Sequence, residues 1–561
     1  MIESNYLVSS IAAKWTDDLI YCSYDANYTK PLYMIASRLA SMVAFPIFLA
    51  ADATHYGWKA LYERTWAILD GKENKAQHLE RAQQSWDIFK ESLFGLGCSP
   101  FGLISPDIVS YHFLSETSPK AGRIELNGKL YSAQGAVLFP KSVEEVQGIV
   151  KDALSKGQKI SVIGAGLSQG RQALPLEGNK AIHTKHLTQI NIDPVTKIAK
   201  VQAGATWQEL QIEANKYDLA IRVMQGSNIF SIGGSISANC HGWAHLEGTL
   251  SNTLLSVTIV NEKGELQRLT PEQSCFKDVV GGYGGFGVIV EAEIILIENQ
   301  ELEESGHEIL PANYVKYFQE QVATNDKILM HTYRLSLHPD HLFQKGVAVN
   351  FTKTGRGFGS NELLVESVRG KWIERIQLHL VRSFKGMRKF ASTRLHQSAL
   401  VTKVRYRNEI MRPTIRALFN HSRASTEWLQ EYFVKGDDLE RFLKFLSQIL
   451  TENDVPVLNA TVRFVTKDDQ TALSYAKEDR FAIVLCFNQA LAPAKIEQTR
   501  QWVRKVIDDL IAHDGTFYLP YQHFATVEQF KKCYPQWQEI AVKNSKTPFT
   551  NGLYQDYLRI S

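Results

Sequence analysis

The 561-residue chain lacks the features that mark several protein classes. Its 6 cysteines include no C-x-x-C pair, so neither a zinc site nor a disulfide scaffold is indicated, and a reducing compartment fits best. The N-terminus MIESNYLVSS has no basic start followed by an apolar core, so it does not read as a secretory signal. A formal net charge of +3 provides no whole-chain attraction to nucleic acid. We therefore expect a cytoplasmic, multidomain protein without a metal site or a nucleic-acid partner.

A membrane-spanning helix is also not expected in the first 118 residues. Their most apolar stretch, residues 31–69, is interrupted by Arg38, and its apolar run ends at Asp52, short of the roughly 20 residues that a spanning helix needs. We treat residues 1–118 as a separate, mostly helical extension. Its helices either pack on the rest of the protein or lie in the surface of a membrane.

Charge is distributed unevenly in the second half of the chain. Residues 369–423 contain fourteen Lys or Arg residues against only Glu374 and Glu409. This basic segment is either a solvated face or a contact for anionic headgroups or a phosphate-bearing substrate. With the N-terminal helices, it is the candidate for a peripheral membrane contact.

The most informative feature is a glycine-rich turn after a short apolar strand, KISVIGAGLSQG at residues 159–170. Glycines at 164, 166 and 170 let backbone N–H groups close on an anion without interference from a Cβ. The pattern departs from the Rossmann fingerprint, because the third glycine falls one position late and Pro175 and Gly178 interrupt any following helix. A classical NAD site is therefore not expected.

Two more glycine turns follow at strand ends. The second is SIGGSISANCHG at residues 231–242, and the third, in VVGGYGGFGVIVEAEIILI at 279–297, enters a long apolar strand. An Asp-Pro turn, a strand and an amphipathic helix lie between the first and second turns. Three such turns predict one extended cofactor site.

These motifs resemble the flavin-binding domain of the vanillyl-alcohol oxidase and p-cresol methylhydroxylase family, from about Ala136 to Ile297. The resemblance implies an α+β fold with FAD as cofactor. It implies a two-subdomain FAD-binding domain at residues 119–297, an antiparallel-sheet cap domain at 298–514, and a C-terminal segment, 515–561, that returns to the flavin domain.

By the same resemblance, the first two turns hold the pyrophosphate and flank the isoalloxazine, and the closing strand meets the adenine. The implied cofactor-binding residues are Gly164, Ala165, Gly166, Leu167, Ser168, Gln169 and Gly170 in the first turn, Gly226, Ile232, Gly233, Gly234, Ser235, Ala238, Asn239 and Gly242 around the second, and Gly285, Val288 and Ile289 in the third.

The mode of flavin attachment follows from one position of the first turn. Leu167 stands where many members of the family carry a histidine that is bonded covalently to the flavin. A leucine has no nucleophile, so noncovalent FAD is predicted. Cys240 is either a flavin link or, as we favour, a small buried residue.

Outside the flavin domain, the chain is similar to the sugar and polyol branch of the family, which includes alditol oxidases, aldonolactone oxidases and decaprenylphosphoryl-ribose oxidase. Strand alternation places Gln430 and Tyr432 on one face, and Asn459 with Thr461 on another, where this branch presents polar groups to substrate. Tyr521 falls where the branch has a lysine; it either contacts substrate, as a hydrogen-bond donor or a proton acceptor of lowered pKa, or forms an aromatic wall.

His241, in the H-G step of the second turn, is the first candidate for a base, because imidazole titrates near neutral pH. The alternative is an orienting donor that packs against the cofactor. His245 and His523 are weaker candidates.

The resemblance implies an FAD-dependent oxidase or dehydrogenase that transfers hydride from a hydroxyl-bearing carbon of a polyol, sugar or lipid-linked sugar to the flavin. Two alternatives stay open. One is an NADPH-linked flavin C=C reductase, and the other is a catalytically reduced flavin-fold protein that is recruited to a membrane or a partner.

Overall fold

A computed structural model of the protein describes residues 136–172, 176, 178–356, 377–412 except 379 and 383, and 425–559. It also describes the backbone of two paired strands, β1 (Arg123–Leu126) and β2 (Lys129–Ser132), and scattered helical positions between 47 and 89. Most of the predicted N-terminal extension, and residues 369–376 and 413–423 of the basic segment, lie outside the described residues.

The first layer is a small parallel sheet with a covering helix. Its strands are β3 (Ala136–Leu138), β5 (Lys180–His183) and β4 (Ile160–Ile163), in that spatial order. Helix α5 (Val143–Ser155) connects β3 to β4 and buries Val146, Val150 and Ala153. The hydroxyl of Ser142 caps it by accepting a hydrogen bond from the N–H of Glu145. The crossover leaves the first glycine turn at the carboxyl end of β4.

The second layer is an antiparallel sheet in the order β10-β9-β11-β7-β6, with β8 also paired to β11. A capping box between Thr206 and Glu209 starts α6, the helix between the first two glycine turns. The strands and helices of this layer are β6 (Ile190–Asp193), β7 (Ile198–Gln202), α6 (Trp207–Asn215), β8 (Leu219–Ile221), α7 (Ile232–Ser237), η2 (Leu250–Thr253), β9 (Leu254–Val260), β10 (Leu266–Leu269), α8 (Ser274–Val279) and β11 (Val288–Glu298).

The third layer is an eight-stranded antiparallel sheet in the order β15-β12-β14-β13-β17-β18-β16-β19. Its strands are β12 (Glu301–Ile309), β13 (Ile328–Leu335), β14 (Gly346–Lys353), β15 (Lys403–Tyr406), β16 (Ser425–Val434), β17 (Val457–Val465), β18 (Arg480–Ala490) and β19 (Thr516–Phe517).

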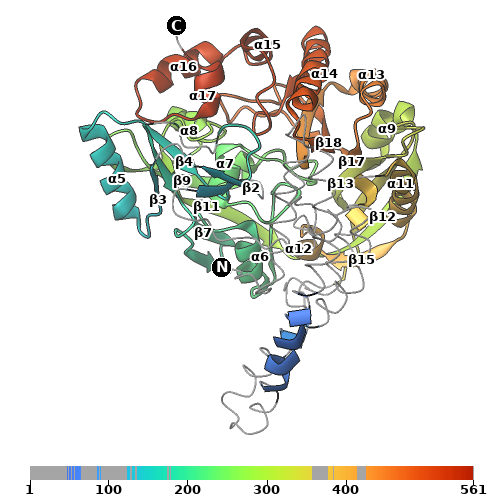
Figure 1. Ribbon diagram of the computed structural model, residues 1–561, viewed down its shortest axis with the longest axis horizontal. Coiled ribbons are helices and arrows are strands. Elements are labelled where there is room, and N and C mark those ends of the chain that lie inside the picture. The colour runs from blue at the N-terminus through green and yellow to red at the C-terminus, as the bar shows by residue number, and fades with distance from the viewer. Residues whose placement is uncertain are drawn as a thin grey trace.

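Helices cover this sheet (Figure 1). They are α9 (Pro311–Tyr317), η3 (Phe318–Val322), α11 (Lys385–Ala399), α12 (Arg407–Ile410), η5 (Gly436–Asp438), α13 (Leu439–Glu452) and α14 (Pro493–Ala512). The apolar sides of α13 and α14 pack against one face of the sheet, where Phe442 and Trp502 join Tyr432 and Ile483 in the largest core. The other face of the sheet is left for the site described below.

The C-terminal segment crosses back to the first layer. It carries α15 (Val527–Cys533), α16 (Trp537–Ser545) and α17 (Gly552–Tyr557), drawn in red in Figure 1. The N–H of Ile160 donates to the carbonyl of Pro548 at 2.9 Å, and the N–H of Thr550 donates to the carbonyl of Ile160 at 2.8 Å. These bonds join the end of the chain to the edge of β4.

This architecture confirms the predicted α+β class and the antiparallel-sheet cap domain. Within the described residues, no helix has both the length and the apolar character that crossing a bilayer requires.

Candidate active site

A cavity of about 1320 Å³ lies between the glycine turns and the eight-stranded sheet. It is larger than the roughly 300–1,000 Å³ of pockets that hold one small molecule. The cavity therefore has room for an extended cofactor and a substrate together.

The first glycine turn forms part of one wall, through Gly164, Ala165, Gly166, Leu167, Ser168 and Gln169. A Cβ at position 164 would lie 2.3 Å from the Oγ of Ser231, so only glycine fits where the first two turns meet. The same hydroxyl accepts a hydrogen bond from the N–H of Ala165 at 2.9 Å. Gly166 has a φ of 69°, in the left-handed region that favours glycine. Local backbone geometry thus explains the glycines of this motif.

Gln169 ties the first turn to the cap sheet. Its side-chain oxygen accepts a hydrogen bond from the N–H of Leu429 at 2.7 Å, and its amide nitrogen donates to the carbonyl of Glu427 at 3.1 Å. Its backbone N–H donates to the carbonyl of Pro520 at 2.8 Å. One residue therefore sets the distance between the turn, β16 and the C-terminal segment.

The second and third turns supply the rest of this wall. The predicted residues that line the cavity here are Gly226, Gly233, Gly234, Ser235, Ala238 and Ile289. A Cβ at position 233 would lie 2.7 Å from the Cβ of Ala203, which shows how closely the second turn packs on the underlying sheet.

Six residues predicted to contact the cofactor do not line the cavity: Gly170, Ile232, Asn239, Gly242, Gly285 and Val288. Their contact with the cofactor stays a prediction. Three of the glycines permit close packing behind the turns. A Cβ at position 170 would lie 2.5 Å from the carbonyl oxygen of Tyr521, and one at position 242 would lie 2.1 Å from that of Met224. A Cβ at position 285 would lie 2.2 Å from the Tyr554 ring.

The other three support the turns through their side chains. Ile232 and Val288 are fully buried in apolar cores. The Asn239 side chain bonds to Asp468 and to Thr249, at 3.1 Å each. All six residues therefore support the backbone of the glycine turns on the side away from the cavity.

Polar groups of the turns lack partners within the part of the chain that the structure describes. No described residue accepts a hydrogen bond from the backbone N–H of Gly166, Leu167 or Ser168. Both polar atoms of the Gln225 side chain and the hydroxyl of Ser227 are buried without a partner, and both residues line the cavity. Since buried polar groups are nearly always hydrogen-bonded, these groups fit a ligand rich in acceptors, such as a dinucleotide pyrophosphate. The residues present therefore fit FAD.

The opposite wall is one face of the cap sheet. Residues of three neighbouring strands line it, among them Glu427, Leu429 and Glu431 of β16, Val484 and Cys486 of β18, and Asn459, Thr461 and Arg463 of β17. Asn459 and Thr461 thus share a face, as the alternation of β17 predicts. The Oγ1 of Thr461 and the Nε of Arg463 are buried without a partner among the described residues. This wall presents hydroxyl, amide and guanidinium groups to the cavity.

A buried polar pair joins the two walls. The Nε2 of His241 lies 2.6 Å from Oε1 of Glu431, and these side chains are 2% and 3% exposed. The hydroxyl of Tyr521 donates to Oε2 of Glu431 at 3.3 Å. When Nε2 carries its proton toward the carboxylate, Nδ1 is an unprotonated acceptor, and Nδ1 has no partner among the described residues. A carboxylate that orients an imidazole in this way is suited to general base chemistry.

The predicted orientation of Gln430 and Tyr432 is wrong. Glu427, Leu429 and Glu431 of β16 line the cavity, whereas the Tyr432 side chain is fully buried in the core behind the sheet, against Phe442. The Gln430 amide lies 2.8 Å from that of Gln522 and outside the cavity lining. The sequence pattern assigns the wrong set of alternate side chains of β16 to the cavity, because both faces of the strand are buried and both carry polar residues.

A proton acceptor role for Tyr521 is also contradicted. Burial, followed by the charge of Glu431, raises the pKa of the Tyr521 phenol well above its usual value. The hydroxyl therefore keeps its proton and donates a hydrogen bond to Glu431, and a contact of Tyr521 with substrate stays a prediction.

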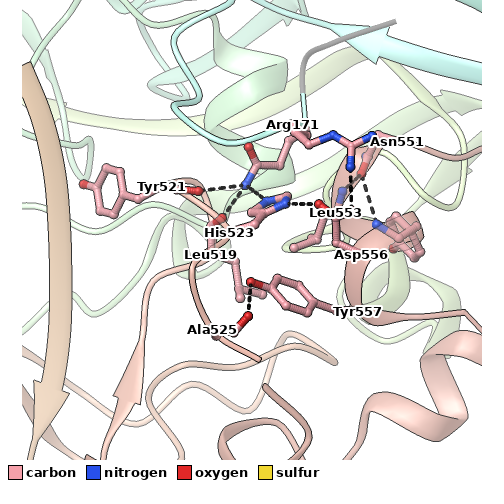
Figure 2. A network of polar contacts seen from close by, with 11 residues as sticks. Arg171, Leu519, Tyr521, His523, Ala525, Asn551, Leu553, Asp556 and Tyr557 are labelled. Atoms are coloured by element: carbon pink, nitrogen blue, oxygen red, sulfur yellow. Dashed lines mark hydrogen bonds and ion pairs between the residues drawn. The ribbon is translucent and has the colours of Figure 1, made fainter. Parts of the chain in front are cut away.

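The two weaker histidine candidates lie outside the cavity lining. Burial lowers the pKa of His245 to about 4, and its ring packs against Phe318 and His331. His523 bonds through Nδ1 to Asp556 at 2.7 Å, and Asp556 also pairs with Arg171 at 2.7 Å. Figure 2 shows this network, with the Tyr521 ring pointing away from it. His523 therefore anchors α17 to the chain after the first turn.

Sequence reasoning missed Glu431, Arg463 and Gln225 as cavity residues. Glu431 could have been found, since it directly precedes the apolar and aromatic residues Tyr432–Val434, and a carboxylate beside such a run is unusual unless it has a partner. The partner of Glu431 comes from a distant segment, and no local pattern marked Arg463 or Gln225.

Comparisons with known proteins agree with this geometry. Residues 135–270 match a family model described as FAD binding domain. The chain is 29% identical over 168 residues to D-lactate dehydrogenase of Archaeoglobus fulgidus, covering 28% of this chain and 38% of that protein. It is 30% identical over 154 residues to decaprenylphosphoryl-beta-D-ribose oxidase of Mycolicibacterium smegmatis, covering 27% of this chain and 33% of that protein.

A plant protein matches over a similar length. Mitochondrial L-galactono-1,4-lactone dehydrogenase of Brassica oleracea is 27% identical over 194 residues, which cover 34% of this chain and 31% of that protein. The chain thus spans about a third of the length of the curated relatives it matches.

Proposed function

Residues 135–270 are an FAD-binding domain of the p-cresol methylhydroxylase type, and on that premise we propose that the protein is an FAD-dependent oxidoreductase acting on a hydroxyl-bearing carbon. The observation that carries the proposal is the buried pair of His241 and Glu431, which faces the same cavity as the glycine turns. Removing hydride from an alcohol carbon also requires removal of the hydroxyl proton, and this pair, in the wall of the cavity, would accept it.

The FAD is held noncovalently in this proposal. Gly164–Gln169 and the turn around Gly233 would hold the pyrophosphate, with Gln225 and Ser227 as further donors. When bound, FAD supplies the hydride acceptor. Leu167 offers no bond to it, and burial raises the pKa of the Cys240 thiol to about 12, so Cys240 stays protonated and unreactive near neutral pH.

Protein groups handle the proton. His241 accepts it from the substrate hydroxyl at Nδ1, while Nε2–H stays bonded to Glu431 and the carboxylate stabilises the imidazolium. Tyr521 donates to the second carboxylate oxygen and so fixes the orientation of Glu431. Burial of all three keeps bulk water from competing for the proton.

The wall of the cavity that the cap sheet forms, here called the substrate wall, favours a polyol, a sugar or a lipid-linked sugar as substrate. Asn459 and Thr461 can bond hydroxyl groups, and Arg463 can bond a hydroxyl, a carboxylate or a phosphate. The relatives named above act, by their names, on lactate, a sugar lactone and a lipid-linked ribose, so each handles an oxygen-rich substrate.

Dye-coupled turnover tests the proposal. Purified, flavin-loaded protein is assayed with polyols, aldonolactones and polyprenyl-phosphate sugars, with an artificial acceptor in place of the unknown natural one. At least one class should reduce the dye, and Glu431→Gln should abolish most of this turnover while retaining flavin. The control is Glu303→Gln, which removes an exposed carboxylate of β12. Reduction by NADPH alone, with no turnover of any alcohol, would contradict the proposal.

A further inference from the structure

The surface formed by α11 and residues 400–406 combines exposed apolar side chains with cations; we call it the α11 surface. Its apolar residues are between 39% and 56% exposed: Phe384, Phe390, Leu395, Leu400, Val401 and Val404. Residues 384–406 contain six Lys or Arg residues and no Asp or Glu. The neighbouring strand β12 adds the exposed Glu303, which lies opposite Val404. Exposed apolar groups beside an excess of positive charge are unusual on a protein surface that meets only water.

Packing within the protein accounts for little of this composition. Helix α11 buries only Ser392 and Ala399. Lys385 and Lys389 pair with Asp340, and Arg405 pairs with Glu304. Arg394 lies 5.2 Å from the ring of Phe390, and neither it nor Lys403 makes an ion pair with any residue in the described ranges. Positive charge and apolar area are therefore left over on the same surface.

The cavity opens at this surface. Phe390 and Leu395 line the cavity and are nevertheless 56% and 54% exposed, and the exposed Arg394 lines it as well. Side chains that line the cavity and are also exposed to solvent lie at an opening of the cavity. One mouth of the cavity is thus rimmed by an aromatic ring, an aliphatic side chain and a guanidinium.

We propose that the α11 surface docks on an anionic lipid bilayer, with the mouth of the cavity facing the lipid. Apolar side chains enter the boundary between headgroups and acyl chains, and the cations neutralise anionic headgroups. A substrate with an apolar chain then enters the cavity from the bilayer. Only this route of entry rests on the proposed function; the docking is independent of it.

Vesicle sedimentation tests the docking with the full-length, flavin-loaded protein. The probes are phosphatidylcholine vesicles and equimolar phosphatidylcholine–phosphatidylglycerol vesicles. The variant Val401→Glu/Lys403→Glu/Val404→Glu changes the surface without touching the cavity lining. The matched control is Val195→Glu/Lys263→Glu/Leu266→Glu, which makes the same charge change at exposed positions of the flavin domain.

The protein should bind anionic vesicles and bind them less at high salt, while neutral vesicles should bind it weakly. The α11-surface variant should lose about tenfold or more in affinity, and the control should bind as the unaltered protein does. A milder variant, Val401→Ser/Lys403→Gln, should show a smaller loss and guards against misfolding as the cause. Turnover of a water-soluble substrate should be unchanged in the α11-surface variant and in the milder variant. This result separates failure of docking from failure of the proposed function.

Three results would overturn the inference. The first is no binding of the unaltered protein to anionic vesicles. The second is equal binding by the α11-surface variant. The third is loss of binding only in Trp58→Glu/Leu61→Glu, which alters side chains that are 69% and 55% exposed near the N-terminus and would assign the contact to that segment instead.

Discussion

The Nε2 of His241 lies 2.6 Å from Oε1 of Glu431, although 190 residues separate the two in the chain. His241 follows α7 in the flavin domain, and Glu431 lies in β16 of the cap sheet. Both are buried, so each would be left with an unsatisfied polar group if the other were removed. The pair therefore joins the flavin domain to the cap sheet at the wall of the cavity.

Replacing Glu431 by glutamine should separate these two effects. The amide can still bond to His241, so the fold and the flavin should be retained, but it cannot stabilise an imidazolium. We expect kcat/KM to fall by about 10²-fold or more, as for loss of general base assistance. Stopped-flow reduction of the flavin by substrate measures the step directly, and a normal reduction rate in this variant would remove Glu431 from the mechanism.

Replacing Gly164 by alanine should displace the flavin. Its Cβ would lie 2.3 Å from the Oγ of Ser231 and would break the bond between that hydroxyl and Ala165. Overpacking of this kind costs about 1–3 kcal/mol. The ratio of flavin to protein absorbance should therefore fall several-fold. The control is Gly148→Ala, at an exposed position of α5 where no atom lies within 4 Å of the new Cβ. This variant should keep its flavin, and its free energy of unfolding should rise by about 0.5–1 kcal/mol.

Acid precipitation should release the flavin from the unaltered protein. Leu167 has no nucleophile, and the Cys240 thiol, with its pKa raised to about 12 by burial, is protonated near neutral pH. All yellow colour should then appear in the supernatant, and the precipitate should show no flavin fluorescence in a denaturing gel. A fluorescent protein band would show a covalent bond, and mass spectrometry of its peptides would locate the residue.

Stability should fall as the pH is lowered from about 6.5 toward 4. Burial lowers the pKa of His245 to about 4 and that of His331 to about 3, whereas an unfolded histidine has a pKa of about 6.5. Between these values the unfolded state binds more protons, so stability rises with pH, by at most about 1.4 kcal/mol per pH unit for each histidine.

Urea unfolding at a series of pH values measures this dependence. His245→Phe should reduce the slope, because it removes one buried imidazole that has no hydrogen-bond partner among the described residues. His341→Asn, at an exposed position, should leave the slope unchanged. Equal slopes in all three proteins would contradict the assignment of buried, neutral histidines.

Replacing Arg463 by glutamine should weaken substrate binding more than flavin binding. The guanidinium lies in the substrate wall with its Nε buried and without a described partner. Loss of a charged hydrogen bond costs about 1.5–3 kcal/mol, which corresponds to about tenfold or more in KM. Arg463→Lys should restore part of the affinity for an anionic substrate. An unchanged KM in both variants would place Arg463 outside the substrate site.

The sequence predicted the parts of the site that depend on local backbone geometry. Gly164 is required by the close approach of Ser231, and Gly166 by its positive φ. Requirements of this kind are visible in a short sequence motif. Tyr432 was misplaced because β16 is buried on both faces, so its pattern does not reveal which face meets the cavity. Glu431 could not be paired with His241, since nothing local encodes a contact across 190 residues.

We propose that the protein oxidises a hydroxyl-bearing carbon, with FAD as the hydride acceptor and His241 and Glu431 as the proton acceptor. Anaerobic mixing of the flavin-loaded protein with polyols, aldonolactones and polyprenyl-phosphate sugars tests it most directly, with flavin absorbance as the readout. We predict bleaching by at least one of these classes, and much slower bleaching in Glu431→Gln. Bleaching by NADPH and by none of the hydroxyl compounds would contradict the claim.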